Sequence, residues 1–156
     1  MIVASGFLDG GPVRPTETID VGREAPAFSG TTLDGSAVSL AELRGRPVIV
    51  NFWGPSCEPC VREFPLLKAK LEAHGPNDLA IVGVLMDDPP DLARAFEERY
   101  GATWPTVVDP GEAIVGSYRV VARPQSYFID RAGILRAIQI GEILEVDFER
   151  QYAKIR

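Results

Sequence analysis

The stretch that determines the fold reads VIVNFWGPSCEPCVREFP and runs from Val48 to Pro65. Its first five residues are mostly branched or aromatic, which is typical of a buried strand. Gly, Pro and Ser then interrupt this pattern, as a tight connection does. From Cys57 onward, cysteine and apolar residues recur at steps of three and four, the spacing of one helix face. The stretch therefore predicts a strand, a turn and a helix whose first turn carries both cysteines of the chain, Cys57 and Cys60.

The place of Cys57 at a helix start predicts a reactive thiol. Unpaired backbone N–H groups at a helix N-terminus carry partial positive charge and favour a thiolate. The thiolate is the form that attacks disulfides, and Cys60 is placed one turn further on to resolve the mixed disulfide. We therefore expect the Cys57–Cys60 dithiol–disulfide pair to be the redox centre, with no further cofactor.

Two structural interpretations of the cysteine pair have less support than the redox interpretation. A disulfide that closes so short a loop contributes only about 2 kcal/mol to stability. A zinc site needs three or four strong protein ligands, and His74 is the one histidine of the chain. The spacing suggests no carboxylate that completes such a site, so we expect no bound metal.

The composition is that of an ordinary globular domain. The chain has 156 residues, of which 46% are hydrophobic and 24% charged, enough for one domain with a proper core. Its net charge of −6 at pH 7, with Lys and Arg scattered, argues against nucleic-acid binding. No apolar run is long enough to span a membrane, and Met1 to Leu8 lacks the features of a signal peptide. We expect any membrane attachment to depend on an anchor outside this sequence.

Residues 1–20 are rich in Gly and lack periodicity, so we expect a flexible N-terminal arm, followed by one domain over residues 21–156. Within that domain the pattern predicts a mixed α/β sheet covered by helices on both faces. The predicted elements are a hairpin around Asp34-Gly35, a helical turn at 40–43 capped by Ser39, a strand at 48–52, a helix at 57–74, a strand at 79–86, a helix at 91–100, a strand at 106–108, a helix at 112–118, strands at 126–130 and 134–140, and a helix at 146–155.

Together with Trp53 and with Arg123-Pro124 before the last hairpin, the Cys-x-x-Cys stretch resembles the thioredoxin superfamily. More narrowly, it is similar to the thiol–disulfide oxidoreductases of the TlpA, ResA and CcmG type. The resemblance covers about residues 21–145. It implies a thioredoxin-like fold with an N-terminal hairpin and an inserted strand and helix, part of which falls within residues 91–109.

The resemblance also implies roles for three side chains. Cys57 is the exposed attacking thiol, Cys60 the resolving thiol, and Glu63 matches an acidic residue one turn after the second cysteine. Because Cys60 and Glu63 are three positions apart, they share a helix face. A carboxylate there exchanges protons with Cys60 and raises thiol pKa values. The alternative for Glu63 is an ordinary solvated helix residue.

On the substrate side, Pro124 matches the proline that this fold holds in cis opposite the cysteines, where backbone groups are free to bind a partner peptide as an added strand. Two positions depart from the family pattern. Ser56, preceded by Pro55, stands where Trp is frequent, and Arg123 stands where a small or uncharged residue is usual. The Arg123 guanidinium either stabilises the Cys57 thiolate or points to solvent. The candidate substrate-binding residues are Trp53, Pro55, Ser56, Arg123 and Pro124.

We expect an enzyme that exchanges thiols and disulfides with protein substrates. The resemblance implies a monomeric reductant in the cell envelope or periplasm, which acts on apocytochrome c cysteines or similar disulfides and is re-reduced by an upstream donor. A cytoplasmic location stays open, and so does the direction of electron flow, because potentials in this fold vary widely.

The cysteine pair leaves two other functions open. A thioredoxin-fold copper chaperone would use the soft thiolates for Cu(I), with His74 or one of two Met residues as a further ligand. A peroxiredoxin-like peroxidase needs Thr or Ser three residues before its reactive cysteine, and neither cysteine of this chain has one there.

Overall fold

The computed structural model describes residues 19–156, and its centre is a five-stranded mixed sheet in the order β5-β4-β3-β6-β7. Strand β3 lies in the middle, parallel to β4 and antiparallel to β6. A separate antiparallel hairpin, β1 with β2, precedes the sheet. The strands are β1 (Ser29–Thr31), β2 (Ala37–Ser39), β3 (Val48–Trp53), β4 (Ala80–Leu85), β5 (Thr106–Val107), β6 (Gln125–Ile129) and β7 (Leu135–Ile140).

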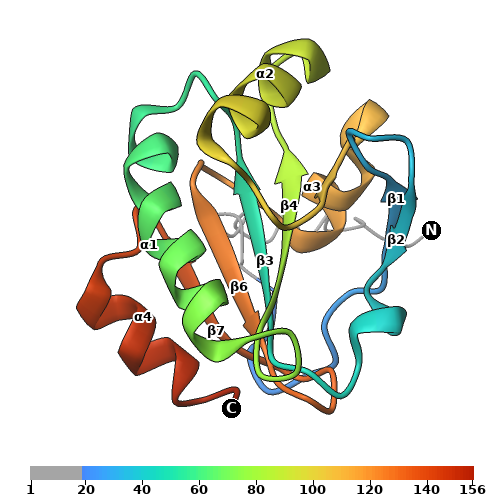
Figure 1. Ribbon diagram of the computed structural model, residues 1–156. Helices are drawn as coiled ribbons and strands as arrows, with labels where there is room; N and C mark the ends of the chain where they lie inside the picture. The colour runs from blue at the N-terminus through green and yellow to red at the C-terminus, as the bar shows by residue number, and fades with distance from the viewer. Residues whose placement is uncertain (1–18) are drawn as a thin grey trace, which may run out of the picture.

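Helices cover both faces of the sheet (Figure 1). They are α1 (Glu58–His74), α2 (Pro90–Tyr100), α3 (Ala113–Tyr118) and α4 (Glu145–Tyr152), with short 3₁₀ turns η1 (Ala41–Leu43) and η2 (Pro110–Glu112). Side chains alternate along β3, so Ile49 and Trp53 pack with α1, α2 and α4. Val50 and Phe52 point the other way and pack with α3, η1 and the N-terminal hairpin. The period-two pattern of a strand thus supplies two cores.

The predicted mixed sheet with helices on both faces is confirmed, and so are the N-terminal hairpin and the inserted helix and strand, α2 and β5. Helix α2 begins at Pro90, one residue before the predicted start, because proline suits the first helical position. The predicted arm, residues 1–20, lies almost entirely outside the described residues. Residues 19–156 include no helix of the length and apolarity that a bilayer crossing requires.

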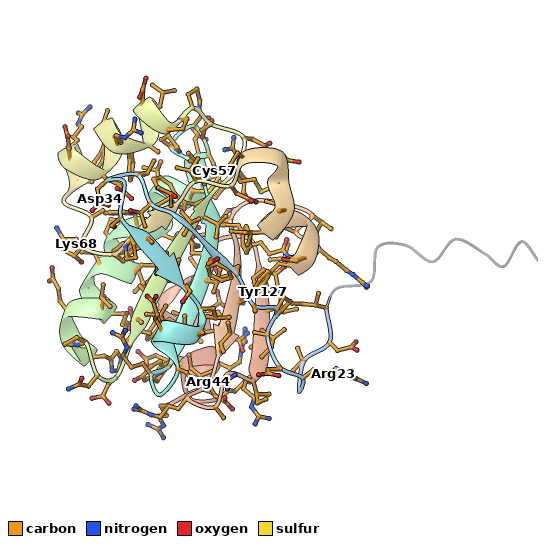
Figure 2. The ribbon with its side chains drawn as sticks, turned by 90° about the vertical axis from the view of Figure 1, so that its right-hand side faces the viewer. Arg23, Asp34, Arg44, Cys57, Lys68 and Tyr127 are labelled. Atoms are coloured by element: carbon orange, nitrogen blue, oxygen red, sulfur yellow. A yellow bond between two sulfur atoms is a disulfide. The ribbon has the colours of Figure 1, made fainter. Side chains whose placement is uncertain are left out.

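The direction of the strands positions the site. Because β3 and β4 are parallel, their carboxyl ends meet at the same edge of the sheet. The turn before α1 follows β3 at this edge, and residues 86–89 follow β4. Figure 2 shows Cys57 near this end of the molecule, with Arg44 near the opposite end.

Candidate active site

The two cysteines lie where the sequence predicts them. Cys57 is the N-cap of α1 and Cys60 lies in its first turn, and the two form a disulfide with a Cα–Cα distance of 5.3 Å. The backbone N–H of Cys60 donates to the Cys57 sulfur at 3.3 Å. Cys57 is 8% exposed and Cys60 3%. Both residues are buried in the disulfide form, so the expected exposure of Cys57 is wrong for this form, although Cys57 is the more exposed residue of the two. A thiolate on Cys57 would be stabilised by the helix N-terminus that already contacts the sulfur.

Glu63 lies inside the protein, one turn after Cys60. It is 2% exposed; Asn51 Nδ2 donates to its Oε1 at 2.8 Å, and the Ile143 backbone N–H donates to its Oε2 at 2.9 Å. Burial raises the pKa of the Glu63 carboxyl to about 7, against these two hydrogen bonds, and the charge of Glu142 adds to the rise. The alternative of a solvated helix glutamate is therefore wrong.

Asn51 is a site residue that the sequence analysis missed. It lies in the middle of β3 and is buried; its Nδ2 donates both to Glu63 and to the Ser126 hydroxyl, the latter at 2.9 Å. The sequence signal that could have identified Asn51 is its position as a polar residue within an otherwise apolar strand. A buried amide needs hydrogen-bond partners, so such a residue indicates a polar contact inside the protein.

The Arg123–Pro124 peptide bond is cis, as the resemblance implied. Pro124 is buried, and its carbonyl oxygen accepts a hydrogen bond from the Gly141 N–H at 2.8 Å. The loop before β6 is thereby tied to the end of β7 and lies next to the cysteine-bearing turn.

Gln125 supports this loop from the core. Its Oε1 accepts hydrogen bonds from the backbone N–H groups of Val121 (3.0 Å) and Ala122 (3.3 Å). Its Nε2 donates to the Tyr127 hydroxyl at 2.7 Å, and that hydroxyl donates to the Tyr118 carbonyl at the same distance. Gln125 is fully buried, so these bonds are shielded from competing water.

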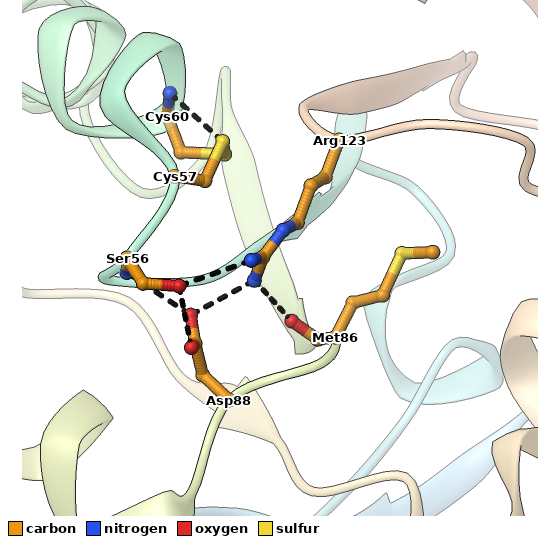
Figure 3. A network of polar contacts seen from close by, with 6 residues as sticks. All are labelled: Ser56, Cys57, Cys60, Met86, Asp88 and Arg123. Carbon is orange, nitrogen blue, oxygen red and sulfur yellow. Dashed lines mark hydrogen bonds and ion pairs between the residues drawn. A yellow bond between two sulfur atoms is a disulfide. The ribbon is translucent and has the colours of Figure 1, made fainter.

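Arg123 does not point freely to solvent; that alternative is wrong. Its Nη1 donates to the Met86 carbonyl at 2.6 Å and to Asp88 Oδ2 at 2.8 Å, and its Nη2 donates to the Ser56 hydroxyl at 3.0 Å. Asp88 in turn accepts from the Ser56 backbone N–H at 3.0 Å and from its hydroxyl at 2.6 Å. Figure 3 shows these contacts beside Cys57 and Cys60. We call Ser56, Asp88 and Arg123 the Asp88 bridge.

Asp88 is the second site residue that sequence reasoning missed, since residues 87–90 fall between the predicted strand at 79–86 and the predicted helix at 91–100. The signal was topological. An acidic residue shortly after the carboxyl end of β4 lies at the same sheet edge as the turn after β3, because the two strands are parallel.

The other predicted substrate-side residues divide into a buried and an exposed group. Trp53 is 5% exposed, donates from Nε1 to Thr106 Oγ1 at 3.2 Å and packs on Phe96, so it supports the turn from below. Pro55 and Ser56 lie at the surface and line a cavity of about 360 Å³ together with residues of α2. Of the two, Ser56 is exposed and Pro55 is half-buried.

His74 lies far from the cysteines. Helix α1 has 17 residues, so His74 at its end is about 25 Å from Cys57. Its ring packs on Tyr152 with 4.2 Å between centroids. Over residues 19–156 no group of three or more His, Cys, Asp or Glu side chains is arranged to hold a metal ion. The copper-chaperone alternative thus gains no ligand from His74.

Comparison with known proteins adds the family. The model of the AhpC/TSA family matches residues 21–138. The chain is 32% identical over 139 residues to the thiol-disulfide oxidoreductase ResA of Bacillus thuringiensis (strain Al Hakam), covering 89% of this chain and 80% of that protein. Identity to ResA of Geobacillus kaustophilus (strain HTA426) is 33% over 138 residues, with coverages of 88% and 79%.

The crystal structure of the thioredoxin domain of a thiol-disulfide oxidoreductase from Bacteroides vulgatus is similar, with a TM-score of 0.78 at 25% identity. The similarity covers 89% of this chain and 100% of that one. The fold, the cysteine pair at the start of α1 and these relatives lead to one conclusion. The chain belongs to the AhpC/TSA family and is a thioredoxin-fold thiol–disulfide oxidoreductase similar to ResA.

Proposed function

We propose that the protein works as a reductant of disulfides in protein substrates, with Cys57 as the attacking thiol and Cys60 as the resolving thiol. The observation that carries this proposal is the buried Glu63 carboxyl behind Cys60, whose hydrogen-bond donors, Asn51 and the Ile143 N–H, are both neutral. The Cys57–Cys60 disulfide is the only redox group that the mechanism requires.

In the first step the Cys57 thiolate attacks one sulfur of the substrate disulfide. An S–S bond forms between Cys57 and the substrate, the substrate S–S bond breaks, and the leaving thiolate takes a proton from water. The N-cap position of Cys57 supports this step, because the helix N-terminus and the Cys60 N–H stabilise the attacking thiolate.

In the second step the Cys60 thiol loses its proton to the Glu63 carboxylate and attacks the Cys57 sulfur. The Cys57–Cys60 disulfide forms, and the second substrate sulfur leaves as a thiolate, which is protonated. The substrate gains two electrons and two protons in total. A carboxyl with a pKa of about 7 suits this transfer, because it both accepts and releases a proton near neutral pH.

The direction of electron flow follows from charge. A carboxylate close to Cys60 without a neighbouring cation disfavours a thiolate there, and an unstable dithiolate favours the disulfide form of the protein. Arg123, the cation next to Ser56, is paired with Asp88. Both features favour a protein that donates electrons.

The physiological setting is proposed by similarity. Relatives named ResA and the resemblance to the TlpA and CcmG type favour a monomer in the cell envelope. The proposed substrates are disulfides of apocytochrome c haem-binding cysteines or similar protein disulfides, and an upstream dithiol protein would restore the reduced form.

The test is to mix the Cys60→Ser variant with a peptide that carries a disulfide between two cysteines of a Cys-x-x-Cys-His sequence. Without its resolving thiol, the variant should accumulate a mixed disulfide through Cys57, detected by mass spectrometry and reversed by dithiothreitol. The Cys57→Ser variant is the control and should form none. If Cys60→Ser forms no adduct, or the adduct maps to another residue, the proposal is wrong.

The direction of flow needs a separate measurement. The equilibrium of the Cys57–Cys60 couple with glutathione should lie on the disulfide side, with a potential in the range of thioredoxin rather than of a strong oxidant. A potential near that of a dedicated oxidase would reverse the proposed direction and leave the exchange chemistry intact.

A further inference from the structure

Asp88 joins three separate segments at the mouth of the site (Figure 3). Its carboxylate binds Ser56, the residue before Cys57, through both the backbone N–H and the hydroxyl. It also binds Arg123, the residue before the cis-proline. Arg123 completes a ring by donating to the Ser56 hydroxyl and to the Met86 carbonyl. The turn before α1, the loop after β4 and the loop before β6 therefore meet in one set of contacts.

The backbone at Gly54 leaves room for these contacts. A Cβ at Gly54 would stand 2.2 Å from both Arg123 Nη1 and Asp88 Oδ2, and 2.9 Å from the Met86 carbonyl oxygen. Atoms at such distances overlap, so a side chain at this position would displace the ion pair. The absence of a side chain at residue 54 is thus matched to the presence of the ion pair.

The charges within the Asp88 bridge balance. The Asp88 side chain is 6% exposed and that of Arg123 21%, so water screens their attraction only partly. Burial raises the pKa of the Asp88 carboxyl, but the hydrogen bonds from Ser56 and the bond and charge of Arg123 outweigh it and hold that pKa below its ordinary value. Asp88 is therefore ionised at neutral pH and offsets the guanidinium charge.

We infer that Asp88 is a positioning residue for thiol–disulfide exchange: it fixes the two loops that a partner polypeptide must contact, and it offsets the Arg123 charge next to Cys57. The inference rests on the proposed role of Cys57 as the attacking thiol. Without Asp88, the Arg123 guanidinium would lose its counter-ion beside Ser56, the residue before Cys57, and Ser56 would lose two of its hydrogen bonds.

The other charged side chains near Cys57 are the same in all the variants that are compared. They lie on α1 and in the loop after β4, and they are Glu58, Arg62, Glu63 and Asp87. None of these four is a hydrogen-bond or ion-pair partner of Asp88 or Arg123. Their contribution to the Cys57 thiol pKa should therefore be nearly the same in every variant below.

The experiment compares Asp88→Asn, Arg123→Gln and the double variant, each in the reduced protein, by the pH dependence of the Cys57 alkylation rate. Asp88→Asn leaves the cation and should lower the Cys57 thiol pKa by about half a unit to one unit. Arg123→Gln leaves the anion and should raise it by a similar amount. The double variant should return close to the wild-type value. A loosened structure alone would move both single variants in the same direction.

The second readout is the KM for a protein disulfide. All three variants break the Asp88 bridge and should raise this KM about threefold to tenfold. The rate with a small disulfide such as hydroxyethyl disulfide should not change in parallel with the KM, because a small molecule has no chain for the loops to position. Arg123→Lys keeps the charge but loses the two-pronged contact. Arg123→Lys should raise the KM and leave the Cys57 thiol pKa at its wild-type value. If Asp88→Asn does not fold, Arg123→Lys takes its place in the experiment.

Glu24→Gln is the matched control, because it removes one carboxylate from an exposed ion pair with Arg44. It should change neither the Cys57 thiol pKa nor the KM. Single variants that shift the pKa in the same direction, or by no more than this control, would overturn the charge-balancing role, and an unchanged KM would overturn the positioning role. Failure of Cys60→Ser to trap a substrate through Cys57, with Asp88 intact, would instead count against the proposed function.

Discussion

Glu63 and Asp88 are two carboxylates close to the cysteine pair, and their pKa values move in opposite directions. Both side chains are largely shielded from water, and for both, burial disfavours the ionised form and acts to raise the pKa. Glu63 has only neutral donors and its pKa rises to about 7. Asp88 has a cation and a hydroxyl, and its pKa falls below the ordinary value. Burial alone therefore does not decide the charge of a carboxyl, and the partners do.

The difference has a chemical use. On the side of Cys60 the protein holds a carboxyl that is half protonated near pH 7, and on the side of Cys57 it holds an ion pair that stays charged. The following predictions test this contrast, beginning with the largest expected effect.

The first prediction concerns stability against pH. The Glu63 pKa is about 7 in the folded protein, against 4.5 for the ordinary group, so the folded state holds an extra proton between these values. Stability of the oxidised protein should fall by about 3 kcal/mol as pH rises from 4.5 to 7 and change little from this source above pH 7. Urea unfolding at a series of pH values measures this slope, and Glu63→Gln should remove it.

Asp88 gives the opposite sign. Its depressed pKa contributes stability that is present above the ordinary value of 3.8 and is lost as pH falls through the folded-state pKa. The two carboxyls therefore act in separate windows, Glu63 above pH 4.5 and Asp88 below pH 4. If the free energy of unfolding changes with pH between 5 and 7 by the same amount in the wild type and in Glu63→Gln, the proposed difference between Glu63 and Asp88 is wrong.

The second prediction concerns the rate of resolution. Glu63→Gln cannot accept a proton from Cys60, so decay of the mixed disulfide at pH 7 should slow by about tenfold to hundredfold. The Gln amide still fits, since Asn51 can turn its own amide to accept from it and from Ser126. Glu72→Gln, an exposed change on the same helix, is the control. Equal decay rates in the two variants would show that Glu63 takes no part in proton transfer.

The third prediction concerns the room beside the ion pair. Gly54→Ala should destabilise the protein by about 1–3 kcal/mol, because the added methyl overlaps Arg123 and Asp88. Gly116→Ala is the matched control: it lies in α3 with no atom within 4 Å of the added Cβ. It should stabilise by about 0.5–1 kcal/mol through helix propensity. Urea midpoints that shift in the same direction for both would contradict the packing argument.

The smallest effect is expected at the exposed ion pair. Glu24 and Arg44 are 69% and 57% exposed, so water and salt screen their attraction. Glu24→Gln should change the free energy of unfolding by less than about 0.5 kcal/mol, and less still at high salt. Urea unfolding measures this change. A loss of 1 kcal/mol or more in the free energy of unfolding would mean that the difference in exposure does not make this ion pair weaker than the Asp88–Arg123 pair at the active site.

The local pattern was enough to predict the central part of the fold. A branched run at 48–52, an interrupted turn and a helical spacing after Cys57 each act over a few residues, and β3 and α1 lie where they were expected. The burial of Glu63 was not predicted: the sequence indicated only that it shares a helix face with Cys60, with an ordinary solvated residue as the alternative. Its surroundings come from β3 and from Ile143, 80 residues further along the chain, and periodicity holds no information over that distance.

The Asp88 bridge was beyond the sequence pattern for the same reason. Asp88 and Arg123 are 35 positions apart and Asp88 and Ser56 are 32 apart. One arrangement of strand pairing brings these segments together, with β3 parallel to β4 and antiparallel to β6. An Asp in a turn and an Arg before a proline are common features, and neither identifies the other without that pairing.

The buried Gln125 has a consequence for how a partner is received. It holds the backbone of Val121 and Ala122 and is itself held by Tyr127, so the loop before β6 is ordered by the interior of the protein as well as by Asp88. An incoming chain then loses its own freedom on docking but does not have to organise the edge it docks against. Selection among partners would therefore depend on how well each one fits a preformed loop, rather than on its ability to order that loop on binding.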